Sequence, residues 1–127
     1  MDKEILENNV LIAEFMGAEK IQYPAPIYGI YKFPVSPDKK HTKMDAIYFE
    51  YHTSWDWLIP IVEKIESLNE IVSIENNSCI IVNNINTEAH EWFTTMHNKN
   101  IDSGKISKIE ATYYAVVEFI KWHNKNK

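Results

Sequence analysis

The amino-acid sequence predicts an α+β fold, in which a mostly antiparallel sheet and about three helices form a layered sandwich. Two terminal segments and one central segment repeat apolar residues at helical spacing. The segments between them are rich in β-branched and aromatic residues and are punctuated by Pro, Gly and Asn. A chain of 127 residues with 45% apolar composition is the size of one domain, so we expect a single globular domain over residues 1–127.

The first predicted helix covers residues 3–18. Ile5, Ile12 and Phe15 fall near one face at helical spacing, which is typical of a helix packed against a core. Gly17 is suited to end this helix, because glycine readily adopts the left-handed conformation that follows many helices. The solvated side is expected to carry Glu4, Glu7, Asn8 and Glu14.

Residues 21–45 hold four of the five prolines, which excludes a long helix there. We expect short strands near 21–23 and 27–33, followed by an exposed turn with the sequence SPDKKHTK. The segment 46–52, AIYFEYH, has strong β-propensity and is predicted to be a strand.

The next segment, YHTSWDWLIPIVEKIESL, predicts a second helix. Ser54 and Asp56 are both suitable N-caps, and the choice decides where Pro60 falls in the helix. We favour Asp56, or a tight 3₁₀ start, because Pro60 then lies near the first turn, where a missing N–H is tolerated. Trp55 and Trp57 then form an elbow between strand and helix, with one indole in the core and the other at the surface.

The remaining segments predict a hairpin, a further strand and a third helix. IVSIE and CIIVNN flank the turn residues 76–78, as in a β-hairpin. Residues 85–97 are ambiguous, and their alternating side chains favour a strand. Ser107 and Glu110 match a capping box at the start of the last helix. The apolar stripe of that helix comprises Ile109, Tyr113, Val116, Val117 and Ile120.

Charge and cysteine content exclude several classes of function. The formal net charge of −5 disfavours an extended nucleic-acid interface. All 13 residues in the Lys+Arg count are Lys, so no guanidinium group can bind phosphate through two parallel hydrogen bonds. Cys79 is alone, which excludes an intrachain disulfide, and we expect it to be buried. The longest apolar runs fall short of the ~18 residues of a membrane span, so we expect no membrane association and a cytoplasmic location.

The sequence contains no GxGxxG, P-loop or GxSxG motif. HEWFTTMH places His90 and His97 seven residues apart, which is about 10 Å along a helix and opposite faces of a strand. Zinc motifs need two histidines on one helical turn, so we expect no metal and no cofactor. His52 precedes the elbow and could orient Asp56, although a structural histidine is the simpler interpretation.

One cluster of aromatic and basic residues is the candidate ligand-binding site. Aromatic rings stack on bases and other flat rings, and neighbouring ammonium groups can balance phosphate. The members are Tyr23, Tyr28, Tyr31, Lys32, Lys39, Lys40, His41, Lys43, His52, Trp55 and Trp57. The alternative interpretation is that the tyrosines are amphipathic strand residues and the lysines form a solvated turn.

Three segments resemble a known family. LIAEFMG, YHTSWDWLIPIVEKI and SKIEATYYAVVEFIKWHN are similar, in the same order, to segments of small uncharacterised phage and prophage proteins, akin to the phage ABA-sandwich domain family. The resemblance implies a layered α/β fold and a viral or mobile-element setting, and hence the cytoplasm of a host bacterium. It implies no enzyme activity and supplies no catalytic residues.

These observations favour a non-enzymatic accessory protein that acts by binding. We expect a host-takeover or counter-defence protein that sequesters a small, nucleotide-like ligand or binds a host protein, as a homo-oligomer. One alternative is a small hydrolase or transferase with an active site assembled from dispersed residues such as His52, Asp56 and His97. The other is a structural or assembly protein of the virion.

Overall fold

The computed structural model describes residues 2–21, 29–75, 78–83, 91–94 and 107–125. The elements are α1 (Lys3–Phe15), β1 (Glu19–Ile21), β2 (Ile30–Lys32), β3 (Lys43–Asp45), η1 (Ala46–Tyr48), α2 (Trp55–Ser67), β4 (Glu70–Glu75), β5 (Ser78–Asn83), β6 (Glu91–Thr94) and α3 (Lys108–Lys125). The predicted α+β class is confirmed, and each strand pair is antiparallel. The described strands form two sheets, ordered β1-β2-β3 and β4-β5-β6, where the sequence predicts one.

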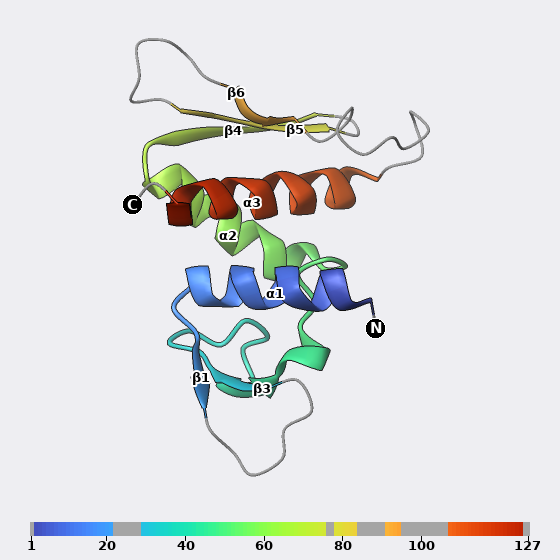
Figure 1. Ribbon diagram of the computed structural model, residues 1–127, viewed down its shortest axis with the longest axis vertical. Helices are drawn as coiled ribbons and strands as arrows, with labels where there is room; N and C mark the ends of the chain where they lie inside the picture. The colour runs from blue at the N-terminus through green and yellow to red at the C-terminus, as the bar shows by residue number, and fades with distance from the viewer. Residues whose placement is uncertain (1, 22–28, 76–77, 84–90, 95–106, 126–127) are drawn as a thin grey trace.

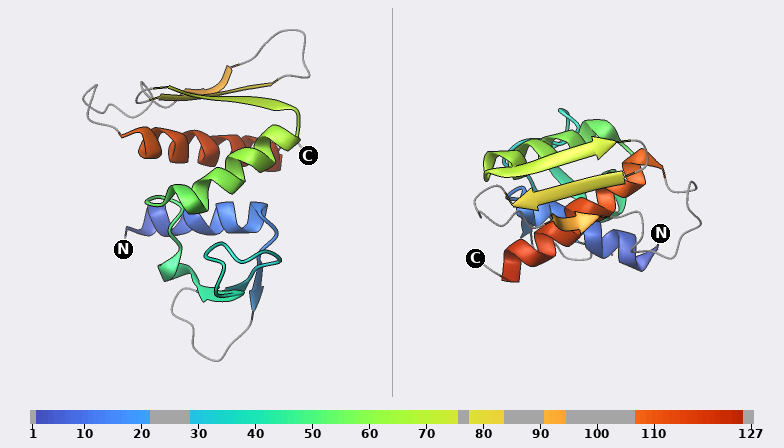
Figure 2. Two further views of the ribbon diagram at one scale, coloured as in Figure 1. Left: turned by 180° about the vertical axis from the view of Figure 1, so that it is seen from behind. Right: turned by 90° about the horizontal axis from the view of Figure 1, so that it is seen from above.

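The three helices lie between the two sheets (Figure 1). α3 packs against β5 and α2 packs against β4, so both helices cover one face of the β4–β6 sheet, as the view from above shows (Figure 2). α1 lies on the side of α3 away from that sheet, and the β1–β3 sheet lies beyond α1 (Figure 1). None of the described helices combines the length and the apolar character that a membrane crossing requires.

α1 forms where the apolar periodicity predicts it and ends three residues earlier than the predicted limit. The Asp2 side chain caps its start by accepting a hydrogen bond from the Glu4 N–H at 2.7 Å. Gly17, at φ 94°, follows its end, as predicted. The prediction that Asn8 lies on the solvated side is wrong, because Asn8 and Asn9 are both buried, with exposed fractions of 6% and 0%.

The predicted strand over 46–52 is also wrong. Ala46–Tyr48 form a 3₁₀ turn, whose first residues are held by a hydrogen bond from the Ile47 N–H to the Asp45 carboxylate at 3.0 Å. Phe49 and Tyr51 are each 1% exposed and belong to the core. Their alternation suggests a strand in the sequence, but it arises here because two aromatic rings are buried by an irregular segment.

α2 begins at Trp55 with Ser54 as the N-cap, so the preferred prediction of Asp56 is wrong. The Ser54 carbonyl accepts hydrogen bonds from both the Trp57 and the Leu58 N–H, at 3.2 and 3.1 Å, which combines 3₁₀ and α spacing in the first turn. Pro60 therefore lies inside the helix, on its exposed side. The helix tolerates this proline because the rest of α2 buries an apolar face against the core. That face comprises Trp57, Leu58, Ile61, Val62 and Ile65.

The predicted hairpin and the last helix are confirmed. β4 pairs with β5 from Glu70↔Asn83 to Glu75↔Ser78. The Ser107 hydroxyl accepts a hydrogen bond from the Glu110 N–H at 3.1 Å, while the Glu110 carboxylate accepts one from the Ser107 N–H at 3.3 Å. In the apolar stripe of α3, Ile109 is half-buried and the other members are buried. Cys79 is also buried, as predicted, and burial raises the pKa of its thiol to about 12.

Candidate functional site

The turn between β2 and β3 is held by a single carboxylate. Asp38 accepts hydrogen bonds from the Lys40 and His41 N–H groups at 2.9 and 2.8 Å, and its other oxygen lies 2.7 Å from His41 Nδ1. The hydrogen bond from His41 holds the pKa of Asp38 well below its usual value. Lys39, at φ 62°, lies exposed at the left-handed position of this turn.

The tryptophan elbow divides as predicted between core and surface. Trp57 is 4% exposed and packs edge-on against Tyr51, with the ring centroids 4.9 Å apart. Trp55 is half-buried at the start of α2. The buried indole fixes the position of the helix start, and the other indole is thereby held at the surface.

The turn and the elbow, although distant in the sequence, line one cleft of about 590 Å³. We call it the turn–elbow cleft, and it is lined by Pro37, Asp38, Lys39, Glu50, Ser54, Trp55, Asp56, Trp57, Ile59 and Pro60. Its lining contains three carboxylates and one ammonium group. The cleft is therefore acidic, although the sequence predicts a basic surface around the turn SPDKKHTK, which we call the lysine turn.

A second hollow of about 470 Å³ adjoins this cleft, because Asp38 and Glu50 line both. His41, Lys43 and the 68% exposed ring of Tyr48 also line it. The lysine turn thus separates two hollows that meet at the same two carboxylates.

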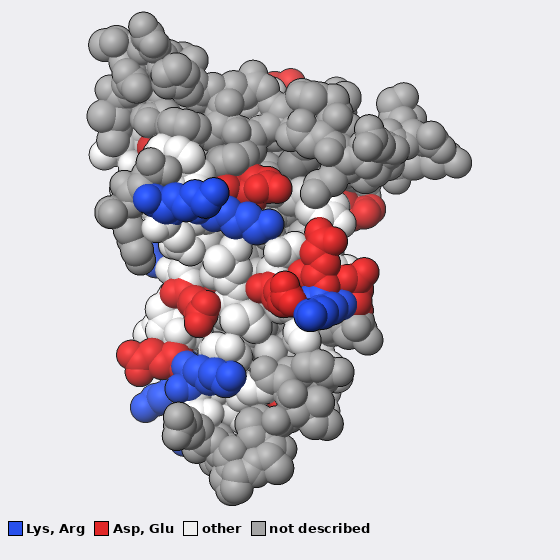
Figure 3. Space-filling model, in the orientation of Figure 1, with Lys and Arg blue, Asp and Glu red and all other residues white. Residues whose placement is uncertain are grey.

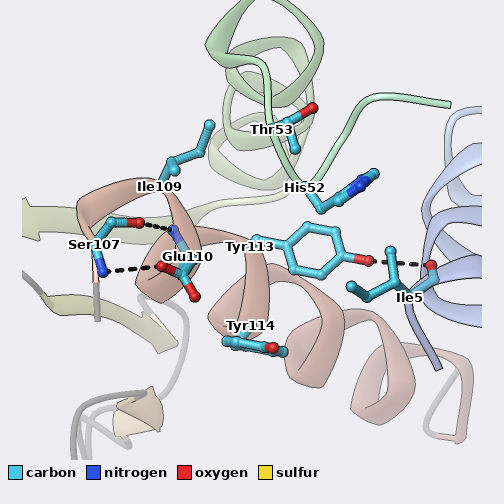
Figure 4. A pocket seen from close by; sticks show the side chains of 8 residues that line it. All are labelled: Ile5, His52, Thr53, Ser107, Ile109, Glu110, Tyr113 and Tyr114. Carbon is cyan, nitrogen blue, oxygen red and sulfur yellow. Dashed lines mark hydrogen bonds between the residues drawn. The ribbon is translucent and has the colours of Figure 1, made fainter. Parts of the chain in front are cut away.

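A third pocket, of about 400 Å³, lies where the first turns of α1 and α3 meet the segment before α2 (Figure 4). We call it the tyrosine pocket, and its lining residues are Ile5, His52, Thr53, Ser107, Ile109, Glu110, Tyr113 and Tyr114. In Figure 4 the ring of Tyr113 lies at its centre, with His52 and Tyr114 on opposite sides of that ring. Its surface is mostly aromatic and aliphatic, unlike that of the turn–elbow cleft.

A buried hydrogen-bond network fixes the orientation of His52 in this pocket. Tyr113 OH donates to Asn9 Oδ1 at 2.9 Å. Asn9 Nδ2 lies 3.4 Å from the carbonyl oxygen of Phe49 and 3.1 Å from His52 Nδ1. A carbonyl oxygen can only accept, so the amide nitrogen must face Phe49 and must donate to His52 as well. His52 Nδ1 is therefore the acceptor, and the proton of the neutral ring is on Nε2.

Burial lowers the pKa of His52, and the nearby Glu50 partly offsets that effect. Protonation of Nδ1 would place a ring N–H against the Asn9 amide N–H₂, where two donors would face each other. The network therefore also favours the neutral ring. His52 thus accepts at Nδ1 and carries its proton on Nε2, and it lines a different pocket from Asp56, so the structure does not show it orienting Asp56.

The structure divides the predicted site residues among several places. Lys39, Trp55 and Trp57 line the turn–elbow cleft, whereas His41 and Lys43 line the adjoining hollow. The ring of Tyr31 is not at this surface, because it packs in the core against Phe49, with centroids 5.8 Å apart. Lys32 and Lys40 are exposed, while Tyr23, Tyr28 and His97 lie outside the described residues.

Several important side chains escaped the sequence prediction. Glu50 follows an aromatic run and carried no signal of its own. Asn9 could have been found, because an amide at a position next to the apolar face of a helix suggests a buried polar contact. Tyr113 was part of the predicted apolar stripe, where a phenol is indistinguishable from a core ring until its hydrogen-bond partner is known, and Tyr114 is its neighbour outside the stripe.

Among the described side chains, no group of three or more His, Cys, Asp or Glu residues is arranged to hold a metal ion. His90 and His97, whose spacing does not suit zinc, lie outside those residues. Comparisons with protein-family models, with curated proteins and with solved structures found no match to this chain. The resemblance to phage and prophage proteins therefore stays a prediction.

Proposed function

We propose that this chain is a non-enzymatic binding protein and that the turn–elbow cleft is its binding site. The observation that carries the proposal is the convergence of residues 37–39 and 54–60 on one cleft. About 590 Å³ is within the usual range for small-molecule sites, ~300–1,000 Å³. The buried ring of Trp57 and the hydrogen bonds of Asp38 hold both sides of the cleft in place before any ligand binds.

The charges of the cleft bear on the class of ligand. A nucleotide phosphate would face Asp38, Glu50 and Asp56, with only Lys39 among the lining residues to balance it. A ligand that combines a flat ring with a positive charge would stack on Trp55 and be attracted by the carboxylates. We therefore propose a cationic aromatic ligand, either a small molecule or a basic segment of a host protein, in preference to a nucleotide.

The biological setting follows from the resemblance of three segments to phage and prophage proteins. We propose an accessory role in host takeover or counter-defence, carried out by sequestering the ligand or by occupying a host protein. We also propose assembly as a homo-oligomer, with the exposed side chains of Val35 and Tyr48, at 80% and 68%, as candidate contacts. His52 and Asp56 line different pockets, which favours this proposal over an active site assembled from both.

Isothermal titration calorimetry with tryptamine and AMP tests the proposal. Each has a flat ring, but tryptamine carries an ammonium group and AMP a phosphate. We expect tryptamine to bind more tightly. Trp55→Ala should weaken its binding by about tenfold or more, since ring stacking contributes ~1–3 kcal/mol.

Two pairs of variants provide the controls. Asp56→Asn should weaken tryptamine binding by about two- to fivefold, whereas Glu63→Gln, on the same helix but outside the cleft, should not. Lys40→Ala, in the same turn as Lys39, should bind tryptamine as the wild type does. Preferential binding of AMP, or unchanged binding by Trp55→Ala, would refute the proposed site.

A further inference from the structure

Three aromatic rings line the tyrosine pocket, and two of them, Tyr114 and His52, are half-buried and partly accessible. Tyr113 is 2% exposed and forms the floor, and its centroid lies 5.6 Å from that of Tyr114 and 6.1 Å from that of His52. The planes meet at 66° and 57°, so the rings do not stack and present surfaces in different directions. Tyr113 therefore packs directly against both neighbouring rings and holds them in place, and the exposed part of the Tyr114 ring is left for a guest.

The aliphatic part of the lining complements these rings. Ile5 and Ile109, both half-buried, line the same pocket, and Thr53 adds its methyl group. No lysine is among the lining residues. A guest that fits this lining is apolar at its surface and carries no negative charge.

Carboxylates make the surroundings of the pocket negative. Glu110 lines it directly. Burial raises the pKa of Tyr114, and the negative charges of Glu4, Glu110 and Asp2 raise it further, so all three carboxylates act on this phenol. Figure 3 shows acidic side chains gathered over the start of α1 and the start of α3.

The partial positive charges at the N-termini of α1 and α3, beside the pocket, offset this negative charge only in part. Each helix N-terminus carries about half a positive charge, which alone would favour an anion. Both starts already have their own carboxylate, because Asp2 accepts from the Glu4 N–H and Glu110 accepts from the Ser107 N–H. Lys3, the nearest basic residue of α1, is 3.9 Å from Glu7 and is largely exposed. Lys108, also exposed, is the first residue of α3, so the described residues at the two helix starts carry four carboxylates (Asp2, Glu4, Glu7 and Glu110) against two ammonium groups.

From this lining and charge we propose that the tyrosine pocket is a second binding site, distinct from the turn–elbow cleft, which takes a small alkylammonium ion. The cation rests against the half-buried ring of Tyr114, which Tyr113 holds in place, and Glu110 balances its charge. Aromatic rings attract such an ion through their negative faces, and methyl groups around the nitrogen satisfy the apolar lining. The neutral state of His52 is required, since an imidazolium would repel the guest.

Choline and 3,3-dimethyl-1-butanol provide a matched pair of probes, because they have the same shape and only choline is charged. We expect calorimetry or NMR titration to show that choline binds at least about tenfold more tightly than the neutral alcohol. Glu110→Gln should weaken choline binding about two- to fivefold and leave binding of the alcohol unchanged. Glutamine is also compatible with the capping box, so the start of α3 should stay intact.

Tyr114→Leu removes one ring from the pocket, and Tyr48→Leu, outside the pocket, is its control. Tyr114→Leu should weaken choline binding by about tenfold, whereas Tyr48→Leu and Trp55→Ala should leave it unchanged. Equal binding of choline and the alcohol, no choline binding at millimolar concentration, or no effect of Glu110→Gln would overturn the proposal. Because Trp55→Ala tests the other cleft, failure of either site is distinguishable from failure of the other.

Discussion

At the scale of single residues, Asn9 connects three parts of the fold. Its amide lies between Tyr113 of α3 and the segment that holds Phe49 and His52, and its exposed fraction is 0%. A buried amide without partners would cost several kcal/mol, and here both its oxygen and its nitrogen are hydrogen-bonded. The position of Asn9 next to the apolar face of the predicted helix suggests a buried polar contact, but its partners, which are distant in the sequence, could not be predicted.

Removal of one hydroxyl should show how much this network contributes. Tyr113→Phe keeps the buried ring but leaves Asn9 Oδ1 without its donor, so we expect the free energy of unfolding to fall by about 1–3 kcal/mol. Urea denaturation provides the measurement. Tyr48→Phe, in which the exposed phenol has little to lose, should change stability by no more than about 0.5 kcal/mol. Equal effects of the two substitutions would contradict the network.

His52 should make the stability depend on pH. Its folded-state pKa is lower than the ordinary value of 6.5, so the unfolded chain binds the proton more readily than the folded one. The contribution of His52 is then complete above pH 6.5 and is lost as the pH falls through the folded-state pKa.

The comparison variant is His52→Asn, whose side-chain oxygen can still accept from Asn9 but does not titrate. Between about pH 8 and about pH 5, wild type should lose more unfolding free energy than His52→Asn does. The same loss in both proteins would contradict the assigned protonation state.

At the scale of elements, the helices and strands whose apolar repeat extends over many residues were predictable, and the irregular segments were not. The helices α1 and α3 and the β4–β5 hairpin follow from periodicity, caps and turn residues, each of which is local. The predicted strand over 46–52 was wrong because β-propensity reflects how well a side chain packs in its surroundings and not the backbone conformation alone. Here an irregular segment, not a strand, buries Phe49 and Tyr51. The predicted start of α2 was wrong because the free energy gained by burying Trp57 outweighs the cost of a proline inside the helix.

The internal proline of α2 leads to a prediction about stability. Pro60 cannot donate a hydrogen bond within the helix, and proline is ~3 kcal/mol less favourable than alanine in a helix interior. Proline also restricts the unfolded chain, which offsets part of this difference. Pro60→Ala should therefore raise the unfolding free energy by about 1–2 kcal/mol in urea denaturation. Glu63→Ala, exposed on the same helix, should change it by less than about 0.5 kcal/mol, and a destabilised Pro60→Ala would contradict our account of α2.

At the scale of the whole molecule, packing determines which predicted site residues come together. The turn SPDKKHTK was predicted to be exposed and the tryptophan elbow to have one indole at the surface, and Lys39 and Trp55 line one cleft in the structure. Asp38 and Asp56 already stand in the sequences of the turn and the elbow, whereas Glu50 joins the cleft only through the fold, so the full acidic character of the cleft could not be predicted. The burial of Tyr31 was equally hidden, since strand tyrosines look the same in the sequence whether they face the core or solvent.

The central claim is that residues 37–39 and 54–60 form one binding site, and backbone amide NMR during a tryptamine titration tests it most directly. We predict that the amide signals of both segments shift together, with a single dissociation constant, while those of the tyrosine pocket stay in place. Shifts confined to one segment, or centred on residues outside the turn–elbow cleft, would contradict the claim.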